Sequence, residues 1–199
     1  PLGTRTLTVR KYLNDECKFA YRESIFKQDE GKHLIILRVA LRLSRIHVLD
    51  KAYKDIGQYE SVHGEVTTLK GLRTAVLEIR RKKLPSDGSI GTAGSFFKNP
   101  IITKEQAREF VMKFPDAPTF PQEDGSVKIS AGWIIDHVLD MRGTRDGDVG
   151  TWSEQALVLV NYGHASSDDI AMFAKKIITN VFRTTNIIIS SEVIFVGEF

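Results

Sequence analysis

The chain has 199 residues, 42% of them hydrophobic, with 28 lysines and arginines against 25 aspartates and glutamates. This composition is sufficient to bury a core and argues against disorder. The net charge of +3 is too small and too evenly spread to indicate a nucleic acid or a membrane surface as a partner. The sequence contains no run of about 18 apolar residues, so it predicts no membrane-spanning helix.

The cysteine and histidine content argues against disulfides and metals. Cys17 is the only cysteine, which excludes an intramolecular disulfide and a multi-cysteine zinc site and favours a soluble, cytoplasmic protein. We expect Cys17 to be a small packed residue. The five histidines lack metal-ligand spacing, so no metal site is expected. His137 and Asp136 are neighbours on an expected helix, where side chains point in different directions, so we interpret the pair as incidental.

The first part of the chain predicts a strand and a helix. Residues 33–43 (HLIILRVALRL) are apolar and β-branched, which is typical of a well-buried strand. A helix is expected to start at Thr67 or Thr68 and to end in the basic turn 80–83. These basic residues stabilise the negative end of the helix dipole, and anion binding is the alternative. Apolar residues recur in this helix at helical spacing: Leu69, Leu72, Val76 and Ile79.

The second part predicts three helices and two strands that follow a turn-rich loop at residues 86–103. One helix is expected to start near Thr103, and a second is followed by a Gly- and Asp-rich stretch. A strand at residues 156–161 precedes the third helix, and a β-rich run occupies residues 186–196. The second helix should carry Trp133, Ile134, Val138 and Leu139 on one face, and the third Ile170, Phe173, Ala174, Ile177, Ile178 and Val181.

The start of the third helix has two possible caps. Either Ser166 caps it together with Asp169, or Ser167 is the cap itself. Across the whole chain, strands and helices are mixed without the regular alternation of a doubly wound sheet. We therefore predict the α+β class.

Residues 91–100 (GTAGSFFKNP) are the first candidate site. Gly91 and Gly94 allow conformations and close approaches that other residues cannot adopt. Such a loop can hold a phosphate, but it lacks the spacing of the known nucleotide-binding glycine motifs, so an ordinary tight turn is the alternative. Three polar side chains follow the glycines: Ser95, Lys98 and Asn99.

Glu192 is the second candidate, because it stands inside an otherwise apolar run. Carboxylates are rarely buried without a partner. Either Glu192 faces solvent on an alternating strand, or it is paired. Arg22, in the aromatic setting FAYRESIF, is a natural counter-charge, and a surface arginine is the alternative.

Four separated blocks of the sequence resemble the UDP-N-acetylenolpyruvoylglucosamine reductase family in content, order and spacing. The run GSFFKNP at residues 94–100 is highly specific for that family, and EQALVLVN at residues 154–161 supports the match. The resemblance covers nearly the whole chain and corresponds to the C-terminal portion of the family. The four blocks are residues 17–27, 83–100, 121–136 and 191–199.

The resemblance implies a flavoenzyme of bacterial cell-wall synthesis in the cytoplasm, with FAD and NADPH as cofactors. Its substrate is the enolpyruvyl ether of UDP-N-acetylglucosamine, whose double bond is reduced to give UDP-N-acetylmuramate. Ser95 is implied as the general acid, and Arg22 with Glu192 as the pair that polarises the enolpyruvyl carboxylate. Arg22 and Arg80 are implied as FAD-binding residues.

The resemblance also implies a set of substrate-binding residues for the uridine and the diphosphate. Two positions depart from the family's pattern. Arg142 stands where a lysine is expected, and Phe120 stands where a tyrosine is common, so a hydroxyl contact is lost there. The implied substrate-binding residues are Tyr21, Tyr53, Lys83, Asn99, Arg142 and Gln155.

The resemblance divides the chain into two parts. Residues 1–85 with 186–199 are expected to be the remainder of a second FAD-binding subdomain, and residues 86–185 the UDP-sugar-binding domain. The chain has no start methionine and lacks the family's N-terminal flavin domain, so we expect a fragment that needs this domain as a partner to hold flavin. A UDP-sugar-binding module without turnover is the alternative.

Overall fold

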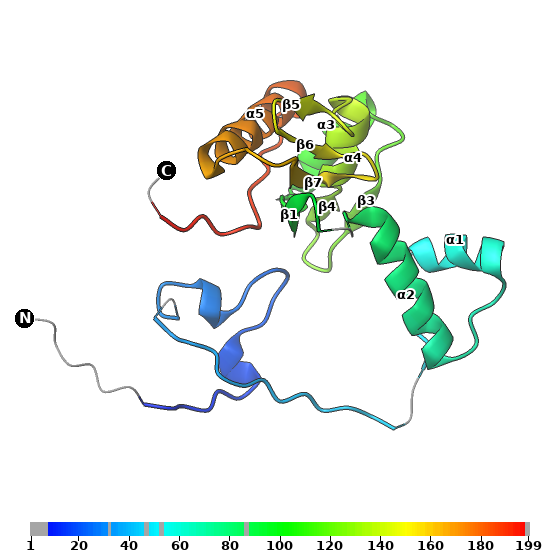
Figure 1. Ribbon diagram of the computed structural model, residues 1–199, viewed down its shortest axis with the longest axis vertical. Helices are drawn as coiled ribbons and strands as arrows, with labels where there is room; N and C mark the ends of the chain where they lie inside the picture. The colour runs from blue at the N-terminus through cyan, green and yellow to red at the C-terminus, as the bar shows by residue number, and fades with distance from the viewer. Residues whose placement is uncertain (1–7, 32, 46–47, 52–53, 86–87, 198–199) are drawn as a thin grey trace, which may run out of the picture. The chain divides into compact units, whose positions relative to one another are not determined.

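The computed structural model describes residues 8–31, 33–45, 48–51, 54–85 and 88–197 (Figure 1). The chain divides into two compact units, residues 1–47 and residues 48–199. Tyr53, one of the predicted substrate-binding residues, lies outside the described residues.

The first unit consists of short turns. Two 3-10 turns, η1 (Asp15–Cys17) and η2 (Ile25–Lys27), flank a tight turn closed by an antiparallel bridge between Ala20 and Glu23. The thiol residue Cys17 is 7% exposed, which confirms the prediction that it is packed.

The strand predicted at residues 33–43 is wrong. The described residues of this stretch form no regular strand, and apolar side chains such as Ile35, Val39 and Leu43 are 79%, 73% and 84% exposed. A strand needs a neighbour to pair its backbone groups and to cover its apolar face. Among the described residues of the first unit no sheet provides that neighbour.

Two helices begin the second unit, α1 (Lys54–His63) and α2 (Leu69–Lys83). The α2 prediction is confirmed: Thr68 is the N-cap, and its hydroxyl accepts a hydrogen bond from the backbone N–H of Gly71 at 3.0 Å. Helix α1 was not predicted. The two helices share a small core in which Tyr59 and Leu72 pack against four buried residues, Ile56, Val66, Ala75 and Ile79.

A four-stranded antiparallel sheet has the order β1-β7-β6-β5. Its strands are β1 (Gly91–Ser95), β5 (Arg145–Asp146), β6 (Val149–Trp152) and β7 (Gln155–Asn161). Strand β7 confirms the prediction at residues 156–161. The expected loop is partly wrong, because its glycine-rich stretch pairs with β7 as an edge strand. Glycines give no hydrophobic alternation, so the pattern carried no sign of a strand there.

A three-stranded sheet has the order β2-β4-β3, formed by β2 (Ile101–Ile102), β3 (Thr119–Pro121) and β4 (Val127–Ile129). Helix α3 (Lys104–Lys113) connects β2 to β3 and confirms the predicted helix near Thr103. Thr103 and Gln106 form a capping box, with reciprocal hydrogen bonds of 3.2 and 3.0 Å.

The second predicted helix is present but changes type along its length. It consists of α4 (Ala131–Trp133) and a π-helical turn, η3 (Ile134–Val138). The third predicted helix is confirmed as α5 (Ser167–Thr185), and its cap is Ser166, which forms a capping box with Asp169. The chain leaves α5 through Asn186, whose φ of 56° is left-handed.

The main core lies under α5, which contacts β6 and β7 (Figure 1). The prediction of a regular strand at residues 186–196 is wrong, since this segment makes a single bridge, between Phe97 and Ser191. Its alternation is nevertheless real, because Ile187 and Ile189 are both 2% exposed whereas Ile188 is 71% exposed. Helices and antiparallel sheets together make the fold α+β, as predicted.

Candidate functional site

Ser95 follows a bulge at the end of β1. Thr92 pairs with Val160 and Ser95 with Val158, so two residues of β1 oppose the single residue Leu159. Gly94 has a φ of 78°, a left-handed value that suits glycine, and a Cβ there would meet no atom within 4 Å. Ser95 is exposed, and the space over Gly94 is open to a ligand.

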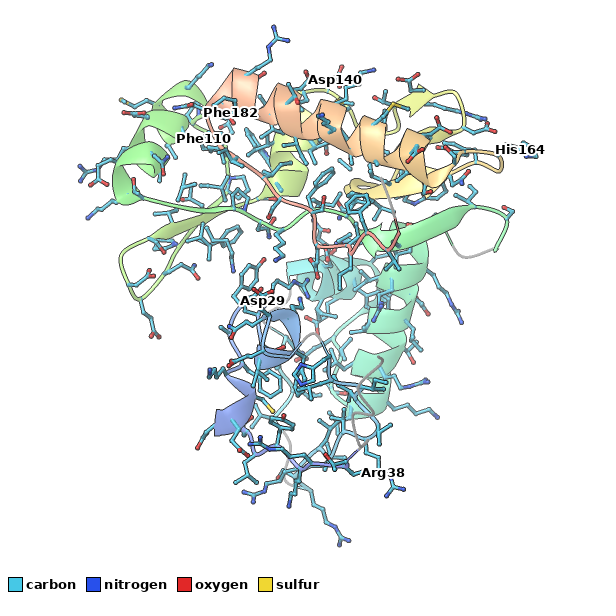
Figure 2. All side chains as sticks on the ribbon, turned by 90° about the vertical axis from the view of Figure 1, so that its left-hand side faces the viewer. Asp29, Arg38, Phe110, Asp140, His164 and Phe182 are labelled. Carbon is cyan, nitrogen blue, oxygen red and sulfur yellow. The ribbon has the colours of Figure 1, made fainter. Side chains whose placement is uncertain are left out.

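The segment after α5 is joined to the residues that follow Ser95 at the end of β1. The backbone N–H of Glu192 donates to the carbonyl oxygen of Phe96 at 2.8 Å, and that of Lys98 donates to Ser190 at 2.9 Å. The rings of Phe96 and Phe195 make an edge contact at 6.1 Å. Both views show the chain after α5 running back past β1 (Figure 2). The structure therefore brings half-buried Glu192 to the residue next to Ser95.

Three predicted substrate-binding residues converge on the short segment Ala131 to Asp136. Asn99 Oδ1 accepts the backbone N–H of Ala131 at 3.0 Å. Arg142 Nε lies 3.2 Å from Asp136 Oδ1. A methyl group on Gly132 would lie 3.4 Å from Gln155 Oε1, so Gln155 packs directly on α4. Residues distant in the sequence thus contact one turn of the chain.

The loop that carries Arg142 is fixed to the sheet by Thr151. This side chain is fully buried, its hydroxyl donates to the carbonyl oxygen of Met141, and it accepts the N–H of Thr144 at 3.1 Å. Asp140 and Gly143, with φ of 51° and 69°, make the turns on either side of Arg142. Hydrogen bonds to a buried side chain therefore fix the backbone of this loop.

Asp136 has a second neighbour that the sequence argument excluded. His137 Nδ1 lies 3.6 Å from Asp136 Oδ2, while its ring stacks on Trp133 at 5.0 Å with an interplanar angle of 7°. The expectation that these neighbouring side chains point apart is wrong. One carboxylate oxygen faces Arg142 and the other faces His137, so Asp136 lies between two cationic or potentially cationic groups.

Lys83 ends α2 and forms an ion pair with α1. Its Nζ lies 2.5 Å from Asp55 Oδ2, and the two side chains are 32% and 20% exposed. The helix dipole is therefore not the only interaction that accounts for Lys83. Arg80, one turn earlier, is exposed on the same helix.

Tyr21 and Arg22 form the tip of the tight turn between Ala20 and Glu23 in the first unit. Both side chains are exposed, and Arg22 has a φ of 55°, which is uncommon for a residue with a side chain. Lys27 Nζ donates to the carbonyl oxygen of Arg22 at 2.9 Å and braces the turn. The turn thus presents two of the predicted site residues from a constrained backbone.

A cavity of about 660 Å³ lies between the β5–β6 hairpin and the start of α5, and none of the predicted site residues lines it. His164 marks its edge (Figure 2). Two carboxylates that line the cavity form ion pairs: Asp146 pairs with Lys176, and Asp148 pairs with Arg145. Within the described part of the chain, no group of three or more histidine, cysteine or carboxylate side chains is arranged for a metal ion.

These features define an α+β domain with a serine and a carboxylate at one bulged sheet edge. The sequence profile of the UDP-N-acetylenolpyruvoylglucosamine reductase C-terminal domain matches residues 85–196. The chain belongs to this reductase family. The boundary between its flavin and substrate parts, as stated above, stays a prediction.

Relatives of the same name support the assignment. The chain is 38% identical over 192 residues to the reductase of Porphyromonas gingivalis, covering 96% of this chain and 56% of the relative. It is 42% identical over 165 residues to that of Chromobacterium violaceum, covering 82% and 48%. For Pseudomonas aeruginosa the identity is 40% over 186 residues, covering 93% and 54%. The chain thus spans about half the length of these relatives.

None of the helices formed by the described residues is both long enough and apolar enough to cross a bilayer.

Proposed function

We propose that this chain carries the substrate-binding and proton-donating part of an FAD- and NADPH-dependent reductase of peptidoglycan precursor synthesis in the cytoplasm. The substrate is UDP-N-acetyl-3-O-(1-carboxyvinyl)-glucosamine and the product is UDP-N-acetylmuramate. The observation that carries the proposal is the attachment of Glu192 beside Ser95, within a chain whose family acts as a reductase.

Ser95 is the proton donor in this proposal. After a hydride has added to the terminal carbon of the enolpyruvyl group, the electron pair of the former double bond resides on the neighbouring carbon and its carboxylate. That carbon takes the hydroxyl proton of Ser95, so an O–H bond breaks, a C–H bond forms, and the serine oxygen regains a proton from solvent. A serine is a weak acid, and its position must therefore be tightly set.

Arg22 and Glu192 polarise the enolpyruvyl carboxylate. Hydride addition pushes negative charge onto that carboxylate, and groups that are held in place before the reaction stabilise the charge without reorganisation. The structural support is that both have constrained backbones, Arg22 in its left-handed turn and Glu192 through its hydrogen bond to Phe96.

In this proposal Arg22 and Arg80 would hold FAD, since a guanidinium can pair with phosphate oxygens. The backbone at Gly94 is open beside Ser95, because a Cβ there would meet no atom within 4 Å. Bound FAD supplies the hydride, and NADPH supplies the electrons that regenerate it.

In this proposal the UDP moiety is bound by six residues: Tyr21, Tyr53, Lys83, Asn99, Arg142 and Gln155. The geometry supports two of these roles in detail. Because Asn99 Oδ1 accepts the N–H of Ala131, its Nδ2 hydrogens are the group that can face a phosphate oxygen. Because Arg142 meets Asp136 through Nε, its two terminal nitrogens are the donors that can pair with a phosphate.

The test is to replace Ser95 by Ala in the flavin-loaded enzyme and to follow both half-reactions by stopped flow. Flavin reduction by NADPH should be unchanged, because it needs no proton on the substrate carbon. Flavin reoxidation by the enolpyruvyl substrate should slow by about 10²–10⁴-fold, and Ser95→Cys should recover part of the rate. An unchanged reoxidation rate would remove Ser95 from the mechanism and favour the alternative, a UDP-sugar-binding module without turnover.

A further inference from the structure

We infer that Thr92 is a positioning residue for Ser95, because its side-chain hydroxyl closes the bulge that sets the backbone before the proton donor. The inference rests on the proposed function, in which Ser95 donates a proton. Thr92 was not predicted from the sequence as a site residue. In this inference it affects the reaction only by setting the position of Ser95.

The Thr92 hydroxyl makes two hydrogen bonds across the bulge. It donates to the carbonyl oxygen of Leu159 at 2.9 Å, and it accepts the backbone N–H of Gly94 at 3.1 Å. Leu159 is the residue of β7 that opposes both bulged residues of β1. One side chain therefore takes the place of the ladder hydrogen bonds that the bulge displaces.

Gly94 makes this closure necessary. Glycine has the widest conformational freedom of any residue, and the position carries no side chain that could pack against a neighbour. The φ of 78° at Gly94 directs the chain into Ser95, and the next fixed point is the hydrogen bond from Phe96 N–H to Leu157 at 2.7 Å. The bulge lies between the Thr92–Val160 pair and this Phe96 hydrogen bond. Among the described residues, the Thr92 hydroxyl is the side-chain group that forms hydrogen bonds to the bulge.

A small change in that backbone is enough to matter for proton transfer. Displacement of a reacting group by about 1 Å costs up to about 10²-fold in rate. Loss of the Thr92 hydroxyl should therefore slow the Ser95 step without removing Ser95 itself. A role in stability alone would lower the melting temperature and leave the proton transfer rate of the folded enzyme unchanged.

The first experiment needs no flavin. Amide hydrogen exchange on the 199-residue chain should be faster at Gly94 in Thr92→Val than in the unmodified chain, by about 2- to 10-fold, as expected for loss of one hydrogen bond. Thr92→Ser retains the hydroxyl and should restore the slow exchange. Equal exchange at Gly94 in all three proteins would overturn the inference. If Thr92→Val does not fold, Thr92→Ala serves the same comparison.

The second experiment measures both half-reactions of the flavin-loaded enzyme. Thr92→Val should slow substrate-driven reoxidation by about 10- to 100-fold and leave NADPH-driven reduction unchanged, with rescue in Thr92→Ser. In a Ser95→Ala background, Thr92→Val should add no further slowing, because both changes act on one step. Additive effects would assign Thr92 to a role independent of Ser95.

Two controls separate the possible failures. Thr103→Val also removes a threonine hydroxyl that accepts a backbone N–H, at the cap of α3, and should lower the melting temperature with no change in either half-reaction. If Ser95→Ala has no effect, the proposed function fails. If Ser95→Ala slows reoxidation and Thr92→Val does not, the present inference fails and the proposed function stands.

Discussion

The backbone N–H of Glu192 donates a hydrogen bond to the carbonyl oxygen of Phe96 at 2.8 Å. This bond joins a segment near the C-terminus to a strand almost a hundred residues earlier. Glu192 takes part in this hydrogen bond through its backbone N–H, so a change of its side chain leaves the donor in place. Side-chain substitutions at Glu192 can therefore test chemistry separately from folding.

Glu192→Ala should slow flavin reoxidation by the enolpyruvyl substrate by about 10²–10³-fold, the size typical of losing one preorganised polar group at a reacting centre. The melting temperature should stay close to that of the unmodified protein, because the backbone hydrogen bond remains. Stopped-flow reoxidation and thermal unfolding give the two readouts. Ser190→Ala is the matched control on the same segment and should change neither, since its contribution to Lys98 is a backbone carbonyl.

Asp136 should orient Arg142 for the nucleotide. Arg142→Gln is expected to weaken UDP binding by about 1.5–3 kcal/mol, the range for a hydrogen bond to a charged group. Asp136→Asn should weaken it by a smaller amount, and only while Arg142 is present, because the carboxylate acts by holding Nε at 3.2 Å. Calorimetric titration of the single and double variants with UDP measures the coupling. Strictly additive losses would show that Asp136 and Arg142 act separately.

Lys83 should contribute to diphosphate affinity in a way that its neighbour does not. Lys83→Ala should weaken UDP binding by about 1.5–3 kcal/mol, as measured by calorimetry. Lys82→Ala removes the same charge from the same helical turn and is the matched control, expected to have little effect. Loss of the ion pair with Asp55 should lower the free energy of unfolding by no more than about 1 kcal/mol, because the pair is partly exposed. Equal UDP affinities of the Lys83→Ala and Lys82→Ala variants would show that Lys83 has no specific role in binding the diphosphate.

Local signals predicted much of the second unit. Helices α3 and α5 carry capping boxes at Thr103 and Ser166 and regular apolar faces, and both were found where the sequence predicted them. The apolar run at residues 33–43 has an equally strong strand pattern but no pairing partner in the described first unit. Apolar periodicity shows only that a segment is able to form a strand. Whether the strand forms depends on a neighbouring strand that pairs with it.

The sequence named candidate site residues one by one but did not predict their arrangement. Ser95 and Glu192 stood out individually, whereas their proximity depends on a backbone contact between distant segments, which no local pattern encodes. The roles proposed for Thr92 and Asp136 were not predicted, because in these proposals each acts through another residue. For Thr92 a local signal existed, since a threonine two residues before a glycine can accept its N–H in a turn-like motif.

The capping box of α5 makes a prediction about acid stability. The pKa of the Asp169 carboxyl is lowered because the Ser166 hydroxyl, and secondly the Ser166 backbone N–H, donate to its Oδ2 at 2.7 and 2.8 Å. A folded-state pKa below the unfolded value of about 3.9 means that the ionised carboxylate stabilises the fold above about pH 4. That stabilisation is lost as the pH falls through the lower, folded-state pKa.

Asp169→Asn should therefore melt at a lower temperature than the unmodified chain at pH 5–7, and the difference should shrink steadily as the pH is lowered below about 4. Asp168→Asn is the matched control. It also removes a carboxylate that interacts favourably with the helix dipole in the first turn, but it leaves the capping box intact. Its effect on the melting temperature should be smaller at neutral pH. Thermal unfolding across this pH range checks the prediction, and a difference between Asp169→Asn and the unmodified chain that grows below pH 4 would show that the sign is wrong.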